Sequence, residues 1–115
     1  MLERWQLRLG GAADARQALE VLVDWVCGEG AVSGPSLLPV VELYVHAARN
    51  PDARQLMGRW MLAVQAALSR WFDPVTTRAL DAVVEGVILH NAYSDGDIDR
   101  AEVRALLQRI TGLSD

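Results

Sequence analysis

The sequence predicts an all-helical protein, an antiparallel bundle of about six helices. Three observations support this fold class. Helix-favouring Ala, Leu, Arg, Glu and Gln dominate the chain, apolar residues recur at three- and four-residue spacings, and no segment alternates apolar and polar residues as a half-buried strand does. The 115 residues suffice for one domain, and an apolar content of 51% is typical of a folded core.

The first two predicted helices cover residues 2–9 and 14–28. The first ends at Gly10 and Gly11, because glycine destabilises helical geometry, and Asp14 is a suitable N-cap for the second. Only a narrow stripe of the second helix is polar, so this helix belongs in the middle of a bundle. The stripe consists of Gln17, Glu20 and Asp24.

A loop is expected over residues 28–35, which contain three glycines and a proline. The third helix is expected over 36–50, with Pro39 in its first turn and Pro51 ending it, since proline disfavours helical geometry in the preceding residue. The fourth helix, expected over 52–72, carries the clearest amphipathic stripe. This stripe consists of Leu56, Met57, Trp60, Met61, Val64, Leu68 and Trp71.

The fifth helix is expected from Asp73, its N-cap, to about Tyr93. A turn at residues 94–96 leads to the last helix, which Asp99 and Glu102 begin as a capping box and which ends near Gly112. The fifth helix has a stripe of large apolar residues (Leu80, Val83, Val84, Val87 and Ile88) and a stripe of small ones (Ala79, Ala82 and Gly86).

Charge and cysteine content exclude several function classes. Eleven arginines against fifteen acidic residues give a net charge of −4, whereas binding a nucleic-acid backbone needs a basic patch. Cys27 is the only cysteine, which excludes an internal disulfide and a thiolate zinc site. The chain shows no signal-peptide pattern and no apolar run near the ~20 residues that span a bilayer, so a cytoplasmic protein without membrane contact is expected.

No motif for catalysis or metal binding is evident. Cys27 lies near the C-terminal end of an apolar helix, where the helix dipole disfavours a thiolate. His46 shares a polar helix face with charged residues, and His90 is more typical of an interface or pocket than of a catalyst. A calcium-loop spacing that starts at Asn91 has no carboxylate there or at Tyr93, its first and third positions. We therefore expect no enzyme, no cofactor and no metal.

Four tryptophans are many for a chain of this size. Trp5, Trp25, Trp60 and Trp71 are most simply explained by core packing. The alternative is that several line a cavity between helices, where Tyr44 would offer a hydrogen bond, since ligand cavities are mostly apolar with a few polar groups.

The last two predicted helices indicate self-association. The fifth helix carries two apolar stripes, and one of them would serve the monomer's core while the other meets a partner. The seam of Leu106, Leu107 and Ile110 on the last helix would otherwise leave an apolar surface exposed. Two copies of this helix pair would form a four-helix bundle across a two-fold axis, so we expect a homodimer.

Two segments resemble the C-terminal domain of bacterial tetracycline-repressor (TetR) regulators. Residues 41–60, VELYVHAARNPDARQLMGRW, resemble the family's aromatic-Glu-Leu-aromatic and Ala-Ala-Arg-(Asp/Asn)-Pro junction. Residues 79–110 resemble its Leu-Asp-Ala…(Asp/Glu)-Gly-aliphatic-His helix, which an acidic linker and Asp-Arg-Ala-Glu-Val-Arg follow. The resemblance covers about residues 2–113 in order.

This resemblance implies an effector-binding and dimerisation domain. Family members bind a small, often hydrophobic effector between the central helices, which moves an N-terminal helix-turn-helix off its operator. The pocket residues implied by position are Trp25, Tyr44, Trp60, Val64 and Val84. The implied dimer residues are Val83, Val87, Leu106, Leu107 and Ile110.

The family's DNA-binding region of about fifty residues has no counterpart here. We therefore expect residues 1–115 to form one domain, the effector domain of a TetR-like repressor, that does not itself bind nucleic acid. One alternative is a ligand-free dimerisation module that pairs with other TetR-like regulators. A weaker alternative is a small-molecule enzyme that uses His46 or His90.

Overall fold

The protein is an all-helical domain, as predicted. The computed structural model describes residues 2–28, 38–92 and 98–113, and within these ranges it contains six α-helices and no strand. The helices are α1 (Leu2–Gly10), α2 (Ala15–Cys27), α3 (Leu38–Arg49), α4 (Pro51–Leu68), α5 (Pro74–Ala92) and α6 (Arg100–Thr111). None of them is long and apolar enough to cross a membrane. The predicted turns at 28–35 and 94–96 fall largely or wholly outside the described residues.

Aspartates start three of the helices, as the sequence predicts. Asp14, Asp73 and Asp99 each accept hydrogen bonds from backbone N–H groups of the following turn, at 2.8–3.0 Å for the shortest bond of each. These bonds satisfy donors that have no partner inside the helix. At the other end of the chain, Gly112 ends α6 with a φ of 73°, a left-handed conformation that glycine adopts without strain.

The boundaries of α4 differ from the prediction at both ends. Asn50, which follows α3, is also the N-cap of α4. Its side-chain oxygen accepts from the backbone N–H groups of Asp52 and Ala53, both at 3.0 Å. Pro51 is the first residue of α4. At the other end α4 stops at Leu68. The Leu68 carbonyl accepts from the N–H of Trp71 and so closes a turn after the helix.

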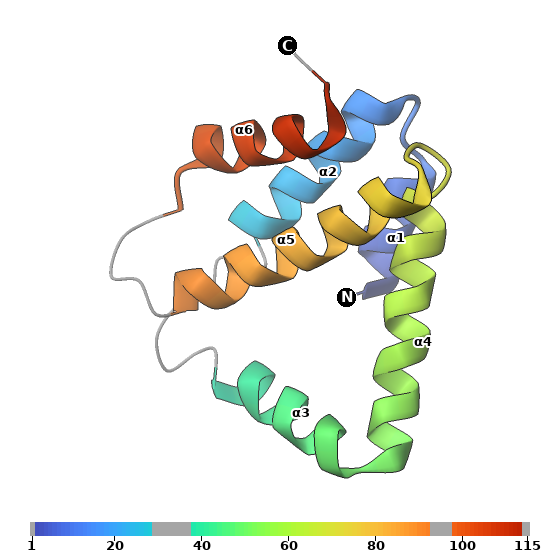
Figure 1. Ribbon diagram of the computed structural model, residues 1–115, viewed down its shortest axis with the longest axis vertical. Coiled ribbons are helices and arrows are strands. Elements are labelled where there is room, and N and C mark those ends of the chain that lie inside the picture. The colour runs from blue at the N-terminus through green and yellow to red at the C-terminus, as the bar shows by residue number, and fades with distance from the viewer. Residues whose placement is uncertain (1, 29–37, 93–97, 114–115) are drawn as a thin grey trace.

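Helix α2 lies at the centre of the molecule, as its nearly continuous apolar surface predicts. It contacts α1, α5 and α6, and α4 in turn contacts α1 and α5 (Figure 1). Leucines from five helices are fully buried in this core: Leu9, Leu22, Leu68, Leu80 and Leu107.

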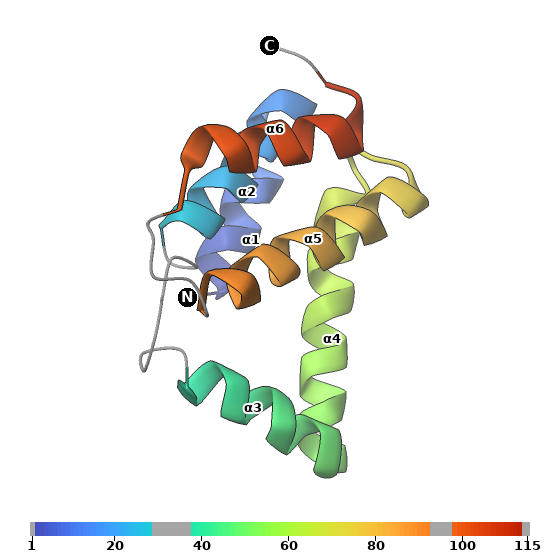
Figure 2. The same cartoon turned by 60° about the vertical axis from the view of Figure 1, so that its left-hand side comes forward.

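Helix α3 is the exception. It packs on α4 and lies apart from α6 and from the central core in both views (Figures 1 and 2). Among its described side chains only Ala47 is buried, and it does not belong to the core cluster. The arm formed by α3 and the first half of α4 therefore lies outside this core.

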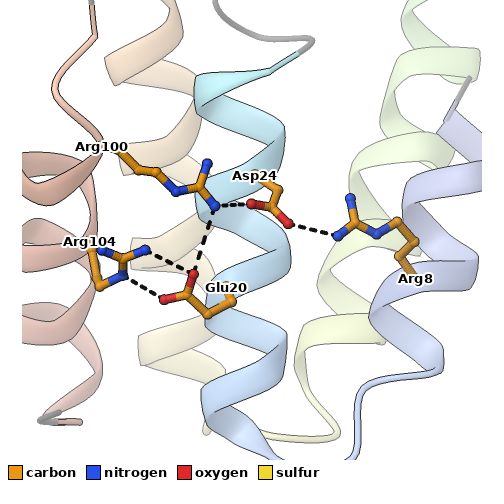
Figure 3. Close-up of polar contacts among 5 residues, drawn as sticks. All are labelled: Arg8, Glu20, Asp24, Arg100 and Arg104. Carbon is orange, nitrogen blue, oxygen red and sulfur yellow. Dashed lines mark hydrogen bonds and ion pairs between the residues drawn. The ribbon is translucent and has the colours of Figure 1, made fainter.

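Ion pairs on the polar stripe of α2 attach α1 and α6 to it (Figure 3). From α1, Arg8 donates to Asp24 at 2.8 Å, and from α6, Arg100 donates to the other oxygen of the same carboxylate. Arg104 of α6 donates to both oxygens of Glu20, at 2.6 and 3.1 Å. The carboxylate of Asp24 in α2 therefore joins α1, α2 and α6. The hydrogen bond from Arg100, followed by that from Arg8, holds the pKa of Asp24 below its usual range against the opposing effect of burial.

The lowered pKa of Asp24 gives a pH-dependent contribution to stability. A depressed carboxyl pKa stabilises the folded state above the unfolded value near 3.9, and this contribution is lost as the pH falls through the lowered folded pKa. We expect Asp24→Asn to lower the free energy of unfolding by about 1 kcal/mol at pH 7, because the side chains are partly exposed and solvent screens the pairs.

In denaturant titrations the difference between wild type and Asp24→Asn should shrink as the pH falls below the unfolded carboxyl value of about 3.9. The control is Glu42→Gln, which removes an exposed charge of α3 and should leave stability unchanged within about 0.5 kcal/mol. A difference of equal size at pH 7 and at pH 2 would contradict an electrostatic role for Asp24.

Candidate functional site

A pocket of about 390 Å³ occupies the space between α3, α4 and α5, with a contribution from α2. This volume lies in the range of about 300–1,000 Å³ that is usual for small-molecule sites. All five residues that the family resemblance implies are on its wall: Trp25, Tyr44, Trp60, Val64 and Val84. Three helices, α2, α3 and α4, thus bring the aromatic residues together.

The wall of the pocket is mostly apolar. Val64 and Val84 belong to the buried core, while Trp25, Tyr44 and Trp60 are half-buried. Two methionines of α4, Met57 and Met61, complete this surface, and their unbranched side chains can adapt to ligands of different shape. These side chains offer hydrophobic contact to a ligand.

Small residues keep the pocket open. Ala47 and Ala48 of α3 and Gly58 of α4 line it, and no atom lies within 4 Å of the position that a Cβ on Gly58 would occupy. A glycine in the middle of a helix reduces its stability, so the open space beside Gly58 comes at a local cost.

Trp25 is held in place from outside the pocket. Its ring stacks on that of Trp5 in α1, with centroids 6.1 Å apart and an interplanar angle of 17°. The guanidinium of Arg8 lies over the Trp5 ring, 4.7 Å from its centroid. The pocket wall is therefore in direct contact with α1.

A few polar groups converge on the pocket. Burial, followed by the hydrogen bond and negative charge of Glu85 and by the charge of Asp81, raises the pKa of Tyr44 above its usual range. The raised pKa keeps the Tyr44 hydroxyl protonated at neutral pH beside the carboxylate of Glu85. Asp81 accepts from the Gln65 amide at 3.0 Å.

The sequence analysis did not place Asp81, Glu85 or Gly58 in the pocket. Asp81 and Glu85 are four residues apart on α5, so both lie on one helix face. This four-residue spacing was the one sequence feature that could have indicated a shared site for Asp81 and Glu85. The same spacing is usual on a solvent-exposed helix face.

The residues expected at a dimer interface have different environments. Leu106 is 40% exposed, and Val83, Val87 and Ile110 are half-buried against the core. Leu107 is only 1% exposed because it packs inside its own chain, where α6 lies on α2. Leu107 was therefore wrongly assigned to the dimer interface, since it has no surface left for a partner.

The nucleophiles and bases singled out in the sequence are not brought together. Cys27 and His46 line neither this pocket nor a second hollow of about 260 Å³ between α5 and α6, and His90 lies on the second hollow. Burial raises the pKa of the Cys27 thiol, which opposes formation of the reactive thiolate.

The described helices form a bundle with a mostly apolar pocket beside its core. Residues 13–113 match the family described as "Tetracyclin repressor-like, C-terminal domain", and the chain belongs to this family. It is also similar to the crystal structure of a candidate transcriptional regulator from Streptomyces coelicolor A3(2), with 34% identity and a TM-score of 0.78. That alignment covers 97% of this chain but 65% of the neighbour, so the chain spans less than two thirds of it. No curated protein matches the chain.

The open space at Gly58 leads to a stability prediction. Gly58→Ala should raise the free energy of unfolding by about 0.5–1 kcal/mol, because alanine favours the helix and its methyl group meets no atom. Gly86→Ala, at an equally open position in the middle of α5, is the matched variant and should give a similar gain. A loss of stability in Gly58→Ala alone, measured by urea unfolding, would show that the pocket is not open there.

Proposed function

We propose that residues 1–115 form the regulatory domain of a TetR-like transcriptional repressor, which binds a small hydrophobic effector and dimerises. The observation that carries this proposal is the pocket of about 390 Å³, whose wall combines aromatic and methionine side chains from separate helices. DNA recognition would belong to a separate N-terminal helix-turn-helix domain, since this chain has a net charge of −4.

The contacts of the pocket suggest how an effector would act. Its wall includes α4, which packs on α1. Arg70, two residues after the end of α4, donates to the carbonyl of Gly10, the last residue of α1, at 2.9 Å. Trp25 reaches α1 through Trp5. An effector that binds one position of α3 and α4 more tightly than another would shift the population of α1 positions, and α1 would transmit this shift to the DNA-binding domain.

Blocking the pocket tests ligand binding. We expect the neutral fluorophore N-phenyl-1-naphthylamine to bind wild type and to quench tryptophan emission, because Trp25 and Trp60 line the pocket. Gly58→Leu should weaken this binding about tenfold, because the added side chain occupies the space of the probe. Ala66→Leu introduces the same side chain at an exposed position of α4 outside the pocket and should leave the affinity unchanged.

Binding that is equal in wild type and Gly58→Leu would place the probe elsewhere. A protein that dimerises but binds no probe would instead favour the alternative of a ligand-free module that pairs with other TetR-like regulators.

Solution mass tests dimerisation through α5 and α6. Light scattering should report twice the chain mass of 12.6 kDa for wild type and a single chain mass for Leu106→Glu, because a charge in an apolar interface is costly. Leu62→Glu is the control, since Leu62 is 61% exposed on α4. A wild-type mass of 12.6 kDa, or an unchanged dimer in Leu106→Glu, would contradict this interface.

A further inference from the structure

Two carboxylates lie on one wall of the mostly apolar pocket. Asp81 and Glu85 are one turn apart on α5, and both are half-buried. Trp25, Trp60 and Met57 contribute apolar surface to the same pocket. A negative charge close to aromatic faces is an environment that attracts cations, because the face of an aromatic ring is itself electron-rich.

Neither carboxylate has a positively charged partner within the described ranges. Asp81 accepts from the neutral amide of Gln65, and Glu85 lies beside the neutral hydroxyl of Tyr44. The ion pairs found among the described side chains join α1, α2 and α6 instead. The protein thus orients the carboxylates of Asp81 and Glu85 with neutral donors but does not neutralise them.

The pocket also has one arginine on its wall. Arg54 is exposed, and its guanidinium donates to the Ala48 carbonyl at 3.1 Å. Arg54 belongs to the first turn of α4, whereas both carboxylates belong to α5, so two negative charges face one positive charge on the pocket wall. The wall formed by α5 therefore keeps its negative character.

Given the proposed function, on which this inference rests, we infer that the effector is a lipophilic cation, an amine or a quaternary ammonium compound. Its positive charge lies beside Asp81 and Glu85, and its apolar body contacts Trp25, Trp60 and the methionines. Opposite charge stabilises the complex in a half-buried site, and the same carboxylates disfavour anionic ligands of similar shape.

An isosteric pair of probes separates charge from hydrophobicity. Benzyltrimethylammonium and neopentylbenzene have nearly the same shape and differ in a cationic nitrogen against a neutral carbon. Both are titrated against wild type with bound N-phenyl-1-naphthylamine, and displacement is followed by fluorescence. We expect the cation to displace the fluorophore at a concentration at least about tenfold lower than the neutral compound, which corresponds to about 1.4 kcal/mol.

The double variant Asp81→Asn/Glu85→Gln tests the role of the carboxylates. It retains an acceptor oxygen for Gln65 and for Tyr44, so the fold and the fluorophore affinity should be preserved, as circular dichroism and direct titration will show. The variant should lose the preference for the cation, whereas Glu42→Gln, which removes an exposed charge outside the pocket, should retain it.

Two results would overturn the inference while the proposed function stands: displacement by the neutral compound at equal or lower concentration, or a preference for the cation that survives in the double variant. Absence of fluorophore binding in wild type would overturn both the proposed function and this inference.

Discussion

The structure depends on the burial of α2. This helix is covered by α1, α5 and α6, so most of its side chains must be apolar, and its half-buried carboxylates need partners on the helices that cover them. Asp24 and Glu20 meet this requirement by pairing with arginines of α1 and α6. The same contacts fix the positions of the first and last helices, which are far apart in sequence, relative to one central element.

The pocket exists because α3 packs on α4 rather than on the central helix α2. Its contacts with α1, α5 and α6 leave α3 to pack on α4, and the short side chains of Ala47, Ala48 and Gly58 do not fill the space beside α5. A close-packed core would have excluded this space, so the cavity requires a helix outside the core. The regulatory role that we propose follows from this division between a tight bundle and a loosely attached arm.

Local chemistry explains which features the sequence could predict. Helix starts at Asp14, Asp73 and Asp99 depend on a side chain bonding to its own neighbourhood, and periodicity alone identifies α2 as central. Leu107 was misassigned because an apolar stripe shows that a face is covered but not whether the same chain covers it. Asp81 was missed for a related reason, since a polar residue on an amphipathic helix suggests solvent until tertiary packing brings an aromatic pocket against it.

The position of α3 outside the central core has an energetic consequence for the whole domain. A segment whose described side chains bury little apolar surface opens with a smaller free energy than the helices that share the core. Hydrogen exchange of its amides would therefore proceed by a sub-global opening that leaves the bundle of α1, α2, α5 and α6 folded. Evolution could thus change the size and shape of the cavity through substitutions in this arm with little loss of the bundle's own stability.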